Sequence, residues 1–130
     1  MVNVRISCPV NPSESEQLVL DAVMRIFPDA SMSRNVKGYE GTAPSIDNFS
    51  KLVRRQMILD ATRAVMIAGI RGEDTMFRLN KQAAFVGKVS FSPKGSVLGT
   101  IAVRIGDDED ILQLIDEFFP STVDGQEVRI

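Results

Sequence analysis

Basic side chains recur at alternating positions in segments that have the pattern of strands, and this spacing suits the recognition of phosphate. Arg5, Arg78, Lys88 and Arg104 each alternate with apolar neighbours. If those neighbours face a core, the four cations all project from the opposite face of the sheet. Arginine and lysine neutralise nucleic-acid phosphates and release the counterions bound to them. The spacing therefore predicts a positive sheet surface that contacts a nucleic-acid backbone.

The net charge of the chain conceals this basic region. The 130 residues include 15 Lys and Arg against 17 Asp and Glu, a formal net charge of −2. Residues 34–104, however, contain 12 of the 15 basic residues and five of the 17 acidic ones. No acidic residue occurs from Thr75 to Gly106. Charge asymmetry of this kind can carry a partner signal that the total hides.

The same charges have a simpler interpretation, which stays open. Exposed cations keep a sheet soluble and hinder edge pairing, or they line a contact between two copies of the chain. Phe77, Phe85 and Phe91 fall in phase with the expected core, so exposed rings that could stack bases are missing. The two candidate functions are thus binding of structured RNA through its shape and backbone, and a homodimeric protein-interaction module with no nucleic-acid role.

Residue types needed for much enzyme chemistry are absent from the sequence. The chain contains no His, which excludes serine-type triads, Cys–His dyads and His-ligated zinc or haem. Its single cysteine, Cys8, cannot form an internal disulfide, which fits a reducing cytoplasm. The acidic run 107–110 is best interpreted as a helix start rather than a cation site. We expect no catalysis, no metal or other cofactor and no small-molecule substrate.

Hydrophobic periodicity predicts one α+β domain over residues 1–130, with helices on one face of a mainly antiparallel sheet. The apolar half of the longest helix, residues 57–68, is expected to be the most buried helix. Turn residues at 92–95 predict a hairpin between the last two strands. No apolar stretch is long enough to span a membrane, so a cytoplasmic protein is expected. The expected elements are strands over 2–7, within 30–43 (with a mobile connection), 75–79, 88–91 and 100–105, and helices over about 12–27, 46–68 (broken once near its middle), 80–86 and 107–118.

Residues 79–91 resemble the signature of an uncharacterised family of small archaeal proteins that are described as predicted RNA-binding proteins. This segment reads Leu-Asn-Lys-Gln-Ala-Ala-Phe-Val-Gly-Lys-Val-Ser-Phe. The segments 8–14, 55–60 and 119–125 also fall where that family has comparable elements. The resemblance covers nearly the whole chain. It implies an archaeal cytosol, structured RNA of ribosomal type as partner, a homodimer as an option, and no catalytic residues.

The resemblance also implies a fold similar to the ribosomal protein that binds 5S rRNA, and it points to individual site residues. Asn80, Lys81, Gln82 and Lys88 are the polar members of the signature, and their types suit contact with phosphates or base edges. Asn80 and Gln82 could equally cap the backbone of a tight turn. Basic residues in the first half of the long helix offer a second contact. The candidate RNA-binding residues are Arg5, Lys51, Arg54, Arg55, Arg78, Asn80, Lys81, Gln82, Lys88 and Arg104.

Overall fold

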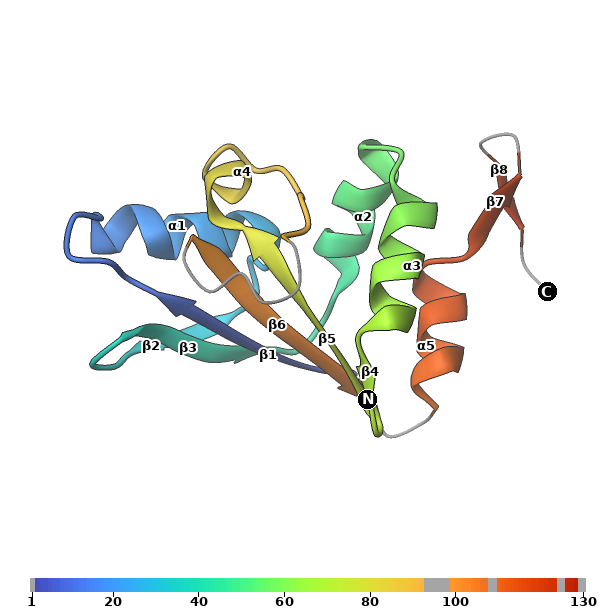
Figure 1. Ribbon diagram of the computed structural model, residues 1–130, viewed down its shortest axis with the longest axis horizontal. Helices are drawn as coiled ribbons and strands as arrows, with labels where there is room; N and C mark the ends of the chain where they lie inside the picture. The colour runs from blue at the N-terminus through green and yellow to red at the C-terminus, as the bar shows by residue number, and fades with distance from the viewer. Residues whose placement is uncertain (1, 93–98, 108–109, 124–125, 129–130) are drawn as a thin grey trace.

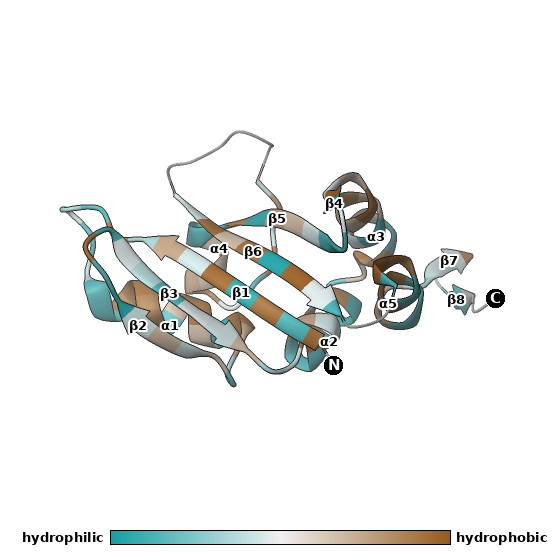
Figure 2. Ribbon diagram, turned by 90° about the horizontal axis from the view of Figure 1, so that it is seen from below, coloured by the Kyte–Doolittle hydropathy of each residue, from teal (hydrophilic) through white to brown (hydrophobic). Residues whose placement is uncertain are grey.

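The computed structural model, which describes residues 2–92, 99–107, 110–123 and 126–128, confirms an α+β fold with helices on one face of an antiparallel sheet. The strands of the main sheet lie in the order β2-β3-β1-β6-β5-β4, and every neighbouring pair is antiparallel. Helices cover the upper face in Figure 1, while Figure 2 shows the opposite face, which no helix crosses. The strands are β1 (Val2–Pro9), β2 (Ser31–Arg34), β3 (Gly38–Ala43), β4 (Ile70–Arg71), β5 (Asp74–Asn80) and β6 (Thr100–Asp107).

The predicted alternation of the first strand is confirmed along β1. Val4, Ile6 and Cys8 are buried, whereas Arg5 and Ser7 are exposed. Because side chains of a strand alternate between the two faces, burying one set fixes the other set on the open face. The central strand of the sheet therefore presents a cation and a hydroxyl to solvent.

Two strand predictions need correction. Residues 31–43 form a hairpin of β2 and β3 rather than one strand, because the Asn35 side chain accepts hydrogen bonds from the N–H groups of Lys37 and Gly38 and closes the turn. The predicted strand 88–91 and its hairpin with 100–105 are also wrong, since β6 pairs directly with β5. Residues 90–92 instead line the edge of β5 that the short β4 leaves free, with a single bridge between Leu79 and Phe91. Of the predicted turn 92–95, residues 93–95 lie outside the described residues.

The long predicted helix is two helices, and the predicted break is confirmed. The backbone of Met57 adopts a φ of 60°, a left-handed conformation that no continuous helix contains. The expectation that the second half is the most buried helix is wrong, because only Leu59, Thr62 and Met66 of α3 are buried. That helix lies at one end of the sheet, so one side of it faces solvent (Figure 1). The helices are α1 (Glu16–Ile26), α2 (Asp47–Arg55), α3 (Leu59–Ala68), α4 (Lys81–Phe85) and α5 (Ile111–Phe118), and a separate hairpin of β7 (Ser121–Val123) and β8 (Gln126–Val128) follows.

The acidic run before the last helix provides a cap, as predicted. Asp110 is the N-cap of α5, and its side chain accepts a hydrogen bond from the Leu112 N–H. A capping carboxylate satisfies a free amide and interacts favourably with the helix dipole. Residues 108–109 lie outside the described residues.

Stacked aromatic rings join the helices to the sheet at the centre of the core. Phe49 on α2 stacks on Phe27 and on Phe77 of β5, with ring centroids 5.7 Å and 5.5 Å away, and contacts the edge of Phe119 at 5.6 Å. All four rings are at most 6% exposed. Phe49 therefore links α2 to β5 and to the segments that follow α1 and α5.

Replacing Phe49 with alanine should lower the free energy of unfolding by about 3–5 kcal/mol, because the buried ring leaves a cavity among three aromatic neighbours. Urea denaturation followed by circular dichroism measures this loss. The matched control is Val36→Ala, since Val36 is fully exposed and its truncation should change stability by less than about 0.5 kcal/mol. Equal effects of the two changes would contradict this description of the core.

Candidate nucleic-acid interface

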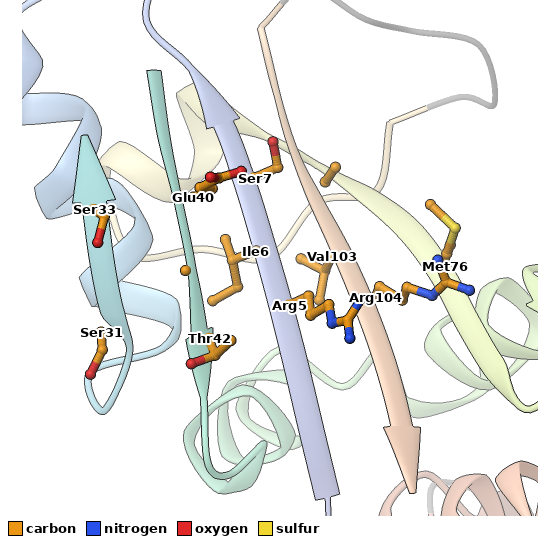
Figure 3. A pocket seen from close by; sticks show the side chains of 12 residues that line it. Arg5, Ile6, Ser7, Ser31, Ser33, Glu40, Thr42, Met76, Val103 and Arg104 are labelled. Carbon is orange, nitrogen blue, oxygen red and sulfur yellow. The ribbon is translucent and has the colours of Figure 1, made fainter. Parts of the chain in front are cut away.

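A shallow hollow occupies the open face of the sheet, on the side opposite the helices. Its volume is about 600 Å³, and side chains of five adjacent strands, β2, β3, β1, β6 and β5, line it. Figure 3 shows these side chains rising from the strands. Half of the lining residues are serine, threonine, glycine or alanine, whose small side chains leave the face hollowed. The lining residues are Arg5, Ile6, Ser7, Ser31, Ser33, Glu40, Gly41, Thr42, Met76, Ala102, Val103 and Arg104.

Two arginines face each other at the centre of this hollow. The pairing of β1 with β6 places Arg5 directly opposite Arg104, as Figure 3 shows. Directly opposite side chains in antiparallel strands have their Cβ atoms roughly 4.5–5.5 Å apart, and like charges at that spacing destabilise the pair. An anion that binds between the two guanidinium groups would relieve the repulsion.

The two arginines differ in their own partners. The Arg104 Nε donates to the Asp74 Oδ2 at 2.6 Å. Asp74 can lie there because residue 106, opposite it on β6, is glycine, and a Cβ atom at this position would overlap the Asp74 carboxylate. Arg5 is exposed and has no hydrogen-bonded or ionic partner within the described chain. Asp74 thus neutralises Arg104, whereas Arg5 has no counterion among the described residues.

Arg78 adds a third cation to the open face. It lies opposite Ala102, one row along the strands from the Arg104–Met76 pair. The cation that was predicted to accompany these three, Lys88, does not lie on the sheet, because residues 86–90 belong to no strand. The structure therefore brings together Arg5, Arg78 and Arg104.

Lys88 instead lies on the helical side of the molecule. Its neighbour Val89 is held by Gln56, whose amide donates to the Val89 carbonyl at 2.8 Å and accepts from the Val89 N–H at 2.7 Å. Gln56 ends α2, the helix that carries Lys51 and Arg55, and all three cations are exposed. Arg54 of the same helix is engaged by Glu127 at 3.1 Å. The second predicted contact is thus a separate group of cations on the side opposite the hollow.

Lys81, the third residue of the signature segment 79–91, is buried. Its side chain is 1% exposed, and its Nζ donates to the Pro9 carbonyl at 2.7 Å and to the Glu14 Oε1 at 3.0 Å. The ammonium group therefore ties the end of β1 and the segment before α1 to α4. In this position it cannot reach a phosphate outside the protein.

Two other members of the signature also differ in placement. Asn80 is the N-cap of α4, and its side chain accepts from the Ala83 N–H at 3.0 Å, which is one of the two roles predicted for it. Gln82 is exposed on α4, away from the hollow. The signature segment thus contributes structural contacts, and its free polar groups lie outside the sheet face.

The charges around Lys81 change the acid–base properties of its neighbours. Burial raises the pKa of Glu14, but the hydrogen bond from the Asn11 N–H and the Lys81 ammonium outweigh it, so the pKa lies below its usual range. Burial raises the pKa of the Cys8 thiol to about 11, against the lowering effect of Lys81. Cys8 therefore stays a protonated core residue, with no role as a nucleophile at neutral pH.

Sequence reasoning missed Asp74 and the hydroxyl groups of the hollow. Asp74 lies outside the strand predicted over 75–79, although its position one residue before that alternation places it in phase with Arg78. Ser31 and Ser33 were missed because the second strand was not resolved into a hairpin. Their alternation with Met32 was the available signal.

Among the described residues, no group of three acidic or cysteine side chains is arranged to hold a metal ion. Within the same residues, no helix has the length and apolar character needed to cross a membrane. The hollow on the sheet is the candidate ligand-binding site.

Comparison with known proteins identifies the family of the chain. A family model described as RNA binding matches residues 3–106. This span begins in β1 and ends in β6, so it contains the main sheet almost completely and leaves out α5 and the last hairpin.

Relatives and solved structures match nearly the whole chain. It is 43% identical to a UPF0201 protein of Methanopyrus kandleri, covering 92% of this chain and 85% of that protein. A UPF0200/UPF0201 protein of Archaeoglobus fulgidus is 35% identical over 98% of this chain, which spans 40% of that relative's length. The crystal structure of a UPF0201 protein from Methanococcus jannaschii superposes with a TM-score of 0.87 at 36% identity and covers 98% of both chains.

Removing the buried ammonium should be far more costly than removing an exposed one in the same segment. Lys81→Met should lower the free energy of unfolding by about 3 kcal/mol at pH 7, because Glu14 is left without its partner in a site where it is mostly buried. Lys88→Met is the matched control and should change stability by less than about 0.5 kcal/mol. The folded-state pKa of Glu14 lies below its ordinary value of 4.5, so its contribution is present above that pH and is lost as the pH falls through the folded pKa.

Urea titrations of the three proteins between pH 3 and pH 7 measure both effects. The wild type and Lys88→Met should lose stability in parallel as the acid limit is approached, while Lys81→Met should lose less. Parallel curves for all three proteins would refute the assignment of this pH dependence to the Lys81–Glu14 pair.

Proposed function

Because the chain belongs to the archaeal UPF0201 family, within the group whose family model is described as RNA binding, we propose that it binds structured RNA through the open face of its sheet. The observation that carries this proposal is the pair of arginines at the centre of the hollow, Arg5 free and Arg104 opposite it. A phosphate between them would convert a repulsive cross-strand pair into a charge-assisted contact. The protein would act by binding alone, without catalysis, and RNA as the ligand would place it in the cytoplasm.

The arrangement of the cations on the open face supports recognition of the RNA sugar-phosphate backbone. Arg5, Arg78 and Arg104 come from three adjacent strands whose register is set by the buried residues on their other face. The spacing of the three arginine Cα atoms is thus fixed before a ligand binds. The exposed cations on the helical side, Lys51, Arg55 and Lys88, would serve as a second and weaker contact with a folded RNA.

A homodimeric protein-interaction module is the alternative function. Among the described residues β2 pairs with β3 alone, so its outer edge could add a strand from a second copy. Light scattering on samples with and without RNA separates the two functions. A dimer that binds no RNA at low salt would favour the interaction module and would overturn the RNA proposal.

Replacing Arg5 with glutamine should weaken the binding of a structured RNA by about tenfold or more, because one charge-assisted contact to phosphate is lost. The slope of log affinity against log salt should become shallower by roughly 0.9, the value for one phosphate contact. Fluorescence anisotropy with a labelled RNA hairpin between 50 mM and 200 mM salt measures both quantities. Arg25→Gln, which removes one exposed charge from the helical side, is the control and should leave the slope unchanged. An unchanged slope for Arg5→Gln would contradict a phosphate contact at the hollow.

Replacing Asp74 with asparagine should have the opposite effect on RNA binding. The change releases Arg104 from its internal carboxylate, so affinity should rise and the salt slope should steepen by roughly 0.9. Stability should fall by no more than about 1 kcal/mol, since both side chains of this ion pair are about a third or more exposed to solvent. The neighbouring change Glu73→Gln alters net charge equally at a residue outside the lining and is the control. Equal gains for the two variants would show that only net charge matters.

A further inference from the structure

The hollow on the open face is divided into a cationic half and a hydroxyl half. Strand register sets out two rows of side chains that run across the sheet. In the first row Ser31 lies opposite Thr42, and Thr42 opposite Arg5. In the second row Ser33 lies opposite Glu40, and Glu40 opposite Ser7. Across β6 and β5 the first row continues through Arg104 to Met76, and the second row continues through Ala102 to Arg78, which lies beside the lining residues. Cations therefore gather over one half and hydroxyl groups over the other.

The hydroxyl groups are free to bind a ligand. Ser7, Ser31, Ser33 and Thr42 are all exposed, and none of their side chains has a hydrogen-bond partner among the described residues. Figure 3 shows the four side chains on β1, β2 and β3, with Ser31 and Ser33 on the strand farthest from the arginines of β1 and β6. Each hydroxyl can both donate and accept a hydrogen bond. This half of the surface therefore suits a partner that itself presents a row of hydroxyls.

Two features exclude a single-stranded ligand whose bases stack on the sheet. The aromatic residues of the main strands, Tyr39 and Phe77, pack on the core side. Stacking platforms for single strands need such rings on the binding face. Glu40 in the middle of the hydroxyl half also repels phosphate, so a nucleic-acid backbone would lie over the arginines and not over β3.

We propose that the open face of the sheet binds across the wide, shallow minor groove of an A-form RNA duplex, with the hollow facing the groove. This inference rests on the proposed function. The arginines contact phosphates of one strand, while the hydroxyls of Ser31, Ser33 and Thr42 exchange hydrogen bonds with ribose 2′-hydroxyls. Glu40 faces the groove, where it can accept from a 2′-hydroxyl or from the amino group of guanine. In this arrangement the cationic half of the hollow lies over the phosphates that border the groove, and the hydroxyl half lies over its riboses.

The dimensions favour RNA over DNA. The five lining strands span roughly 19 Å, which is four inter-strand spacings of about 4.8 Å. The minor groove of A-form RNA is wide and shallow, so a broad sheet surface can reach its 2′-hydroxyls without entering it. The minor groove of B-DNA is about 6 Å wide and has no 2′-hydroxyl, so a surface of this breadth can meet only its phosphates.

Three probes of one sequence test the proposal with the full chain: a blunt RNA duplex of about 16 base pairs, the length that spans two minor grooves, the DNA duplex of that sequence, and one RNA strand alone. Fluorescence anisotropy at a single salt concentration compares their affinities. The RNA duplex should bind about tenfold more tightly than either of the others, the difference expected for one or two net hydrogen bonds. Preference for the single strand, or equal binding of the two duplexes, would overturn the proposal while leaving RNA binding intact. Absence of binding to any RNA would instead overturn the proposed function.

A variant of the hydroxyl half supplies the second measurement. The triple change S31A/S33A/T42V removes three exposed hydroxyls and keeps each side chain close to its original size and shape. The ratio of RNA-duplex to DNA-duplex affinity should fall towards one, while DNA affinity and the salt slope stay unchanged. The control S13A/S121A removes two exposed hydroxyls away from the hollow and should leave the ratio unchanged. A ratio that survives the triple change would refute the role of these hydroxyls.

Discussion

The register between β1 and β6 is the constraint on which the open face depends. Val4 and Ile105 lie opposite each other on the buried side, and so do Ile6 and Val103. A shift by one residue would bring every buried side chain of a strand to the solvent side, so these apolar pairs allow a single alignment. The same alignment places Arg5 opposite Arg104. The repulsion between the two cations costs well under the several kcal/mol by which the buried pairs together stabilise the sheet. The core thus holds in place a charge arrangement that the two strands would not adopt for their surface residues alone.

The signature segment of the sequence, residues 79–91, stabilises the fold, and the arginines of the open face lie elsewhere. In residues 79–91 the side chain of Asn80 caps α4, and Lys81 joins Glu14 and the Pro9 carbonyl. Val89 in the same segment is fixed to Gln56 through two hydrogen bonds. The contacts of Lys81 and Val89 join segments that are distant in the chain, whereas the Asn80 cap is local. The arginines of the hollow belong to strands whose sequences are individually unremarkable.

Local patterns predicted the fold class, the alternation of β1, the break near Met57 and the cap of α5, because each depends on neighbouring residues. The burial of Lys81 could not be predicted in this way, since its partners Glu14 and Pro9 are 67 and 72 residues away in the sequence. The segment 88–91 has the composition of a strand, but β6, its predicted partner, already pairs with β1 on one side and with β5 on the other. The candidate site was predicted in part: phase alone identified Arg5, Arg78 and Arg104. The facing pair, the Asp74 contact and the hydroxyl half require the order of strands. The likeness to the 5S-rRNA-binding ribosomal protein stays a prediction.

The space that Gly106 leaves for Asp74 gives the molecule a built-in counterion. Arg104 is held in place by this carboxylate, so a ligand that replaces it gains only the difference between two anions and not the full attraction of a bare guanidinium. A chloride ion or a small free carboxylate offers no advantage over the residue already present. A polymer gains more, because it contacts Arg5 and its neighbours at the same time and can offset the exchange at Arg104 through those other contacts. We therefore expect the sheet face to prefer ligands that carry several charges in a row over the simple salts of the cell.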